Sequence, residues 1–126
     1  MKKPTRVSDF EMARRALVVD DDPLVLELVV SMLEELGCET ILARSGSEAL
    51  GQLARDQSVE ILVADINMPG LSGVQLAERA CGFRPELRVL LLSGRESDGR
   101  GFPLLQKPFS QPDLRRTMAE TIGLCD

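Results

Sequence analysis

Four apolar runs in this chain lead into polar residues, and this pattern constrains the possible folds more than any other feature. The polar residues that follow the runs include Asp20, Asp65, Ser93 and Lys107. Short apolar runs of this kind are typical of buried parallel strands. In open α/β sheets, ligands bind at the edge formed by the carboxyl ends of the strands. The sequence therefore predicts that carboxylates, a hydroxyl and an ammonium group meet at one edge of a sheet.

Strand and helix signals alternate along the chain. The expected strands are Ala16–Val19, Thr40–Ala43, Val59–Ala64, Arg88–Leu92 and Phe102–Leu105. Helix starts are expected at Asp22-Pro23 and at the capping-box spacings that begin at Ser45, Ser72 and Ser110. Helix ends are expected at Gly37, at Gly82 with Pro85, and at Gly123. The alternation predicts an α/β fold with a doubly wound, five-stranded parallel sheet and helices on both faces.

Length and composition narrow the class of protein. A chain of 126 residues with 44% hydrophobic residues is expected to form one domain, here residues 16–124 after a poorly ordered extension at 1–15. The net charge of -5 argues against direct nucleic-acid binding, and no apolar run is long enough to span a membrane. Three widely spaced cysteines favour reduced thiols and a cytoplasmic location. The absence of histidine excludes histidine-based catalysis within these residues.

The chemistry of the predicted edge points to a phosphate-handling metal site. Asp20, Asp21 and Asp65 would repel one another, and a hard cation such as Mg²⁺ relieves that repulsion with oxygen ligands. Lys107 offers a positive charge and Ser93 a neutral donor to phosphoryl oxygens. A carboxylate can also act as a nucleophile toward phosphorus. Positioning and charge stabilisation of this kind are what phosphoryl transfer requires.

The chain resembles a response-regulator receiver domain of two-component signalling over about Ala16 to Leu124. The motifs that carry the resemblance are the acidic pair Asp20-Asp21, the phospho-acceptor position Asp65 followed by Met68-Pro69-Gly70 and Ser72-Gly73, the hydroxyl position Ser93, and Lys107-Pro108-Phe109. The segment from Leu105 to Phe109 is similar to receivers of hybrid histidine kinases. A stand-alone regulator and a module of a longer protein both remain open, as does the oligomeric state.

The resemblance implies a strand order of 2-1-3-4-5 and a phosphoryl group passed to Asp65 from a histidine kinase or a histidine phosphotransfer protein. It implies Mg²⁺ held by Asp21, Asp65 and the backbone carbonyl of Asn67, with Asp20 acting through a water. Lys107 would pair with the phosphoryl group, and Ser93 would turn inward to bond it and move the loop that follows. Such a domain is a signalling phospho-acceptor that catalyses only its own phosphorylation and dephosphorylation, without membrane contact.

Two departures from the family pattern stand out. Leu104 occupies the position where the family usually has an aromatic switch residue, and Phe102 is the nearest candidate to replace it. The segment between Gly94 and Phe102 is short, charged and rich in glycine, so we expect a reduced or missing fourth helix with at most one helical turn and mobile backbone. Partner binding would then fall to the first helix or to the last helix, Pro112–Ile122.

Two functional classes other than a phosphorylation-controlled module fit parts of this pattern. A phosphohydrolase of the haloacid-dehalogenase type also uses an aspartate nucleophile after a strand, but it typically needs Asp-x-Asp, whereas Asn67 stands at the second position here. A binding module without phosphorylation would be expected to lack Asp65 or Lys107, and both are present. Incubation with a small phosphodonor distinguishes a phosphorylation-controlled module from a phosphohydrolase. The module gains the mass of a phosphoryl group, whereas the hydrolase releases phosphate with turnover.

Overall fold

The computed structural model describes residues 14–94 and 99–122, and its centre is a five-stranded parallel sheet. The strands are β2 (Arg15–Val19), β3 (Glu39–Ala43), β4 (Val59–Asp65), β5 (Arg88–Ser93) and β6 (Leu104–Gln106). Their order in the sheet is β3-β2-β4-β5-β6, and every neighbouring pair is parallel. Numbered along the chain, this is the expected order 2-1-3-4-5. Both the fold class and the strand order predicted from the sequence are therefore confirmed.

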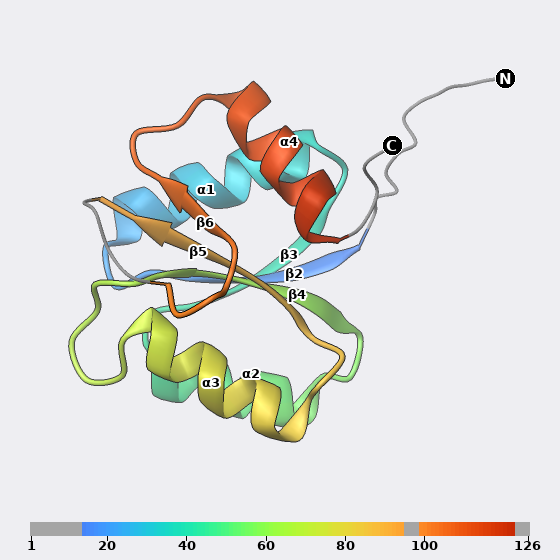
Figure 1. Cartoon of the computed structure of the whole chain (residues 1–126). Coiled ribbons are helices and arrows are strands. Elements are labelled where there is room, and N and C mark those ends of the chain that lie inside the picture. Colours follow the sequence, from blue (N-terminus) through green and yellow to red (C-terminus); the bar gives the residue numbers. More distant parts are fainter. Residues whose placement is uncertain (1–13, 95–98, 123–126) are drawn as a thin grey trace, which may run out of the picture.

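Four helices in the described residues cover the two faces of the sheet (Figure 1). They are α1 (Pro23–Glu35), α2 (Gly46–Arg55), α3 (Gly73–Phe83) and α4 (Gln111–Thr121). Helices α1 and α4 lie on one face, and α2 and α3 lie on the other. Within the part of the chain that the structure describes, no helix has the length and apolar character needed to cross a membrane.

The alternation of side chains along the strands produces two separate hydrophobic cores. In β2, Leu17 faces the core under α2 and α3, while Val18 faces the core under α1 and α4. The central strand β4 is buried along almost its whole length. Its Leu62 faces the core under α2 and α3, and its Val63 faces the core under α1 and α4. A strand that is covered on both faces must be apolar throughout, which explains the uninterrupted apolar runs of the sequence.

The predicted helix caps are mostly confirmed. Asp22 accepts a hydrogen bond from the backbone N–H of Leu24, and Pro23 follows in the first turn of α1. Reciprocal capping boxes are present at Ser72 with Gln75 and at Ser110 with Asp113. Ser45 also caps its helix. The Glu48 carboxylate, however, accepts from the N–H of Arg44, one residue before the cap, so the expected reciprocal bond to Ser45 is absent.

Of the glycines that were predicted to end helices, the one after α1 does so and the one in α3 does not. Gly37 has a φ of 92° just after α1, as expected of a glycine that ends a helix. The helix α3 ends at Phe83 and is capped by Arg84, directly before Pro85, as expected, but Gly82 lies inside the helix and is not its stop. Gly123 lies outside the described residues.

The fifth strand begins later than the sequence predicts. Phe102 and Pro103 precede β6 in a turn, in which the Phe102 N–H donates to the Gly99 carbonyl at 3.0 Å. Phe102 packs against the core under α2 and α3. Gly99 lies over the same part of the sheet, since a Cβ there would sit 3.8 Å from Leu91 Cδ1. An apolar residue that anchors a turn cannot be distinguished from a strand residue by its hydrophobicity alone.

The described residues of the crossover between β5 and β6 form no helix, whereas a helix is usual at this place in doubly wound domains. Of its described residues, Gly94 and residues 99–103, none lies in a helix. The predicted reduction of the fourth helix is confirmed. The expectation of mobile backbone concerns mainly residues 95–98, which lie outside the described part. Residues 1–13 of the expected extension 1–15 lie outside it as well, whereas Arg15 is the first residue of β2.

Candidate functional site

The carboxyl edge of the sheet brings together the side chains that the sequence singled out. Asp20 directly follows β2, Asp65 is the last residue of β4, Ser93 is the last residue of β5, and Lys107 directly follows β6. The strands are parallel and neighbours in the sheet, so their carboxyl ends lie along one edge. Each of these residues reaches the site because it stands where an apolar strand stops.

Three carboxylates converge at this edge. Asp20, Asp21 and Asp65 each offer a carboxylate oxygen that lies within 4.8 Å of those of the other two. Asp20 and Asp65 are buried, with exposed fractions of 3% and 6%, whereas Asp21 is exposed. Like charges at this separation repel one another unless a cation compensates them. The arrangement is therefore unfavourable for the protein alone and favourable for a bound cation.

Lys107 supplies one positive charge to the cluster. Its Nζ lies 3.0 Å from Asp65 Oδ1 and 3.7 Å from Asp20 Oδ2. The backbone N–H of Lys107 donates to the carbonyl of Ser93 at 2.6 Å, which fixes the start of the Lys107-Pro108-Phe109 segment to the end of β5. Among the described residues of the cluster, one lysine faces three carboxylates, so their summed charge is negative.

One carboxylate oxygen of Asp20 is buried without a hydrogen bond, although the ammonium group of Lys107 lies 3.7 Å from it. Its Oδ1 accepts a hydrogen bond from the backbone N–H of Asp22 at 2.9 Å. Its Oδ2 is buried and has no hydrogen-bond partner. Burial raises the pKa of the Asp20 carboxyl, and the charges of Asp65 and Asp21 raise it further, while the Asp22 N–H and Lys107 oppose the rise. A buried carboxylate oxygen without a donor, beside two more carboxylates, fits a hard divalent cation with oxygen ligands.

The two remaining predicted residues lie at the same edge but are placed differently. Ser93 is completely buried at the end of β5. Asn67 lies in the loop after β4, two residues beyond Asp65, and is exposed. The structure thus joins Asp20, Asp21, Asp65 and Lys107 into one cluster, and the parts given to Ser93 and to the Asn67 carbonyl stay predictions. Asp22 caps α1, as expected, and its backbone N–H also binds Asp20.

One residue of the site whose role the sequence did not indicate is Gly73. Its N–H donates to the carbonyl of Ile66 at 3.0 Å, so the first turn of α3 is bound to the backbone beside Asp65. A Cβ at this position would meet the Asp65 carbonyl and would lie 2.9 Å from Ile66 Cα. Only glycine allows this close approach. The sequence showed Ser72-Gly73 as part of the family motif and Ser72 as a helix cap, but not the contact that requires the glycine.

Comparison with known proteins agrees with this site. The family model of the response regulator receiver domain matches residues 16–119. Response regulator MprA of Mycobacterium tuberculosis is 35% identical over 115 residues, which cover 85% of this chain and 50% of MprA. The transcriptional regulatory protein AruR of Pseudomonas aeruginosa is 36% identical over 91 residues, which cover 69% of this chain and 37% of AruR. The chain spans half or less of the length of these two relatives.

Solved structures show the same likeness in three dimensions. The response regulator TrrA of Thermotoga maritima, in complex with Mg(2+)-BeF, superposes with a TM-score of 0.79 and 27% identity, covering 86% of this chain and 98% of that one. The receiver domain of the hybrid histidine kinase CckA gives a TM-score of 0.75 and 28% identity over 86% of this chain and 98% of that one. The family match extends over most of the chain, and the chain belongs to the response regulator receiver domain family.

Proposed function

We propose that this domain accepts a phosphoryl group on Asp65 from a phosphohistidine donor, in a Mg²⁺-dependent reaction, and changes conformation in response. The observation that carries this proposal is the cluster itself: Asp65 lies among carboxylates within 4.8 Å, and its Oδ1 is 3.0 Å from the ammonium group of Lys107. A nucleophilic carboxylate, a cation-binding set and a fixed positive charge are the parts that phosphoryl transfer to aspartate needs.

Mg²⁺ would be held by the carboxylates of Asp21 and Asp65 and by the backbone carbonyl of Asn67, with Asp20 acting through a water. The clustered oxygens support this assignment, as does Asp20 Oδ2, which is buried and accepts no hydrogen bond. The solved TrrA complex with Mg(2+)-BeF supports it as well. A bound Mg²⁺ supplies charge neutralisation for the carboxylates and for phosphoryl oxygens at this edge.

Asp65, Lys107 and Ser93 each have a separate role in the transfer of the phosphoryl group. A carboxylate oxygen of Asp65 forms the new bond to phosphorus, while the bond from phosphorus to the donor's histidine nitrogen breaks and its electron pair leaves with the imidazole. Lys107 keeps its ammonium group beside Asp65 and binds a phosphoryl oxygen through a charge-assisted hydrogen bond. Ser93, at the end of the neighbouring strand, donates to another phosphoryl oxygen and carries the change into the segment after β5.

The donor is a separate histidine-bearing domain, because these 126 residues contain no histidine. We assign this part to a histidine kinase or a histidine phosphotransfer protein. A cytoplasmic location agrees with Cys38 and Cys81, which are both free thiols. Burial raises the pKa of Cys38 to about 11, so this thiol stays protonated and unreactive. The net charge of -5 supports signalling to proteins over direct binding of nucleic acid by this domain.

The test is incubation with a small acyl phosphate and Mg²⁺, followed by intact-mass spectrometry. The wild-type protein should gain one phosphoryl group that persists for minutes, and the nearly isosteric Asp65→Asn variant should gain none while keeping its fold by circular dichroism. Phosphorylation of Asp65→Asn at the wild-type rate would show that Asp65 is not the acceptor. Continuous phosphate release with turnover on many phosphate esters would indicate a hydrolase instead.

A further inference from the structure

The loop between β4 and α3, residues 66–72, holds the Asn67 carbonyl that the proposed function places at the metal. Its first part is anchored by the buried side chains of Ile66 and Met68. Its end is anchored by the hydrogen bond from the Gly73 N–H to the Ile66 carbonyl. Asn67 is exposed between Ile66 and Met68, so the position of its carbonyl depends on where the rest of the loop holds Met68.

That support includes a very close contact with the start of α2. Gly46 is buried and is the first residue of α2. A Cβ added to Gly46 would lie 2.6 Å from Leu71 Cβ and 3.1 Å from Leu71 Cδ1. Real Cβ atoms do not approach other atoms this closely, so Leu71 occupies the space that a side chain at position 46 would need. The loop therefore rests against the main chain of α2 itself.

The backbone conformation of Gly46 gives no other reason for glycine. Gly46 is not among the residues with positive φ, so an L-amino acid could adopt the same backbone angles. Alanine is also the better residue in a helix. Local preference thus favours alanine, and only the contact with Leu71, which lies far away in the sequence, requires glycine.

We propose that Gly46 is a positioning residue that seats the phospho-acceptor loop, so that α2 contributes to the metal site without touching it. The inference rests on the proposed function. The nearest atom, Leu71 Cβ, is attached directly to the main chain, so no change of side-chain rotamer relieves the contact. A methyl group at position 46 would displace the loop backbone. The hydrogen bond from the Gly73 N–H to the Ile66 carbonyl holds the end of the loop, so the displacement passes from Leu71 back along the main chain toward Met68 and the Asn67 carbonyl.

The expected result is a loss of Mg²⁺ affinity that depends on Leu71. Gly46→Ala should bind Mg²⁺ about tenfold more weakly than the wild type, the size of effect typical of residues that orient metal ligands. Leu71→Gly removes the clashing Cβ, so Gly46→Ala should have no effect on affinity in that background. Leu71→Ala keeps the Cβ and should restore little. This difference between the two Leu71 variants is specific to the geometry of the contact.

The experiment measures Mg²⁺ affinity by titration calorimetry and stability by urea unfolding without metal, on all the variants and on a matched control. Gly51→Ala is the control, because Gly51 lies in the same helix and a Cβ there meets only Arg55 Nη1, at 3.4 Å. It should bind Mg²⁺ like the wild type. If Gly46→Ala is too unstable to measure, Gly46→Ala/Leu71→Gly is compared with Leu71→Gly alone, and both should fold and bind equally.

Wild-type affinity in Gly46→Ala would overturn the inference, as would equal losses from Gly46→Ala in the wild-type and Leu71→Gly backgrounds. Failure of the double variant to fold where Leu71→Gly folds would overturn it too. These results are distinct from a failure of the proposed function, in which the wild-type protein itself would show no Mg²⁺ binding and no phosphorylation.

Discussion

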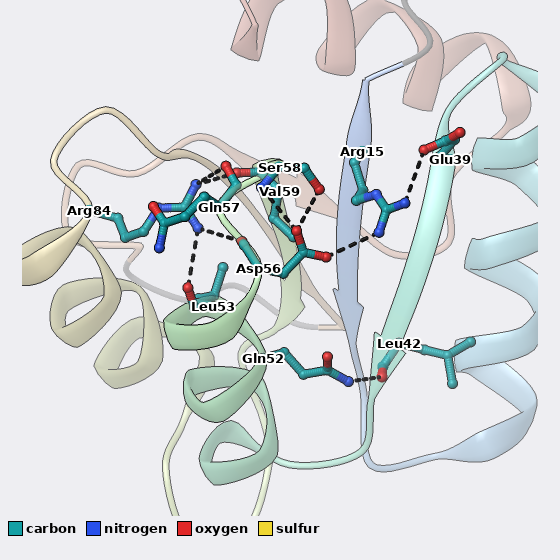
Figure 2. Close-up of polar contacts among 10 residues, drawn as sticks. All are labelled: Arg15, Glu39, Leu42, Gln52, Leu53, Asp56, Gln57, Ser58, Val59 and Arg84. Atoms are coloured by element: carbon teal, nitrogen blue, oxygen red, sulfur yellow. Dashed lines mark hydrogen bonds and ion pairs between the residues drawn. The ribbon is translucent and has the colours of Figure 1, made fainter.

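Both ends of the sheet bury charged groups, but the two ends differ in whether these groups find all their hydrogen-bond partners within the protein. At the carboxyl end, Asp20 and Asp65 are buried beside Asp21 with Lys107 as their cation, and Asp20 Oδ2 has no hydrogen-bond partner. At the amino end, Arg84 is buried and its guanidinium group donates to several backbone carbonyls (Figure 2). They belong to Leu53, Asp56, Gln57 and Val59.

At the amino end, the buried guanidinium group of Arg84 finds its hydrogen-bond acceptors within the protein, without any ligand. Its hydrogen bonds join the last turn of α2 and the start of β4 to the end of α3, where Arg84 is the capping residue. The Asp56 carboxylate accepts from Ser58 and from Arg15, and Arg15 also reaches Glu39 (Figure 2). A buried charge that is fully hydrogen-bonded stabilises a fold, whereas one that lacks partners destabilises it until a ligand binds. The amino end of the sheet therefore contributes to stability, and the carboxyl end is suited to bind a ligand.

Removal of the buried arginine should give the largest effect. Arg84→Met keeps the aliphatic stem but leaves the carbonyl oxygens of the α2–β4 connection without their donor, which should lower the free energy of unfolding by about 3 kcal/mol. Urea unfolding measures this loss. Arg88→Met, an exposed arginine at the start of β5, is the matched control and should change stability by less than about 0.5 kcal/mol. Equal losses in the two variants would remove the distinction between the two ends.

The next largest effect distinguishes the roles of two neighbouring aspartates, Asp21 and Asp22, at the carboxyl end. Asp21→Ala removes a carboxylate of the cluster and should weaken Mg²⁺ binding roughly tenfold or more. Asp22→Ala removes the cap of α1 and should lower stability by about 1 kcal/mol, with little change in Mg²⁺ affinity. Calorimetric titration and urea unfolding of both variants test the two roles. The same loss of Mg²⁺ affinity in both would contradict them.

The two ends should also respond to acid with opposite signs in metal-free protein. Burial raises the pKa of Asp20. Its contribution to stability is therefore fully present below the unfolded-state value of about 3.9 and is lost as the pH rises through the folded pKa. Hydrogen bonds from the Ser58 side chain and backbone lower the pKa of Asp56. Its contribution is present above the unfolded value and is lost as the pH falls through the folded pKa.

Urea unfolding at a series of pH values tests this difference. Relative to Asp20→Asn, the wild-type protein should gain stability as the pH falls toward about 3.9 from above. Relative to Asp56→Asn, it should lose stability as the pH falls further below that value. Slopes of the same sign for the two variants would show that the two ends do not differ in the way the structure indicates.

The last variant, Lys107→Ala, should not weaken metal binding. Removal of the ammonium group 3.0 Å from Asp65 Oδ1 leaves the carboxylates less compensated, so Mg²⁺ should bind at least as tightly as in the wild type. The phosphorylated variant should nevertheless lose its conformational response, because the phosphoryl group lacks its charge-assisted partner. Titration calorimetry and amide chemical shifts before and after phosphorylation measure the two effects. Weakened Mg²⁺ binding with an intact response would refute this role of Lys107.

The sequence predicted the carboxyl end better than the amino end, for a physical reason. Asp20, Asp65 and Lys107 stand directly beyond apolar strands, and parallel strands bring such positions to one edge whatever the details of packing. Arg84 precedes Pro85 after a helix and resembles an ordinary exposed residue in the sequence. Its burial depends on carbonyls of a connection that is distant in the chain, and no local pattern encodes that.

The other differences between sequence and structure have the same origin. Phe102 was expected in a strand but anchors a turn, because its apolar character serves either position. The requirement for glycine at position 46 arises from Leu71, and that at position 73 from the backbone of Asp65. Periodicity and capping signals report which faces of an element are buried, but close contacts between distant segments become visible only in the folded chain.

Mg²⁺ dependence of stability tests the central claim most directly, that the carboxyl end is a ligand site and the amino end a structural one. Binding to the folded state alone adds about 2.7 kcal/mol at a ligand concentration one hundred times the dissociation constant. The wild type and Arg84→Met should gain the same increment on addition of Mg²⁺, although Arg84→Met starts from a lower stability, and Asp21→Ala should gain little. An increment that is lost in Arg84→Met, or kept in full in Asp21→Ala, would contradict the account.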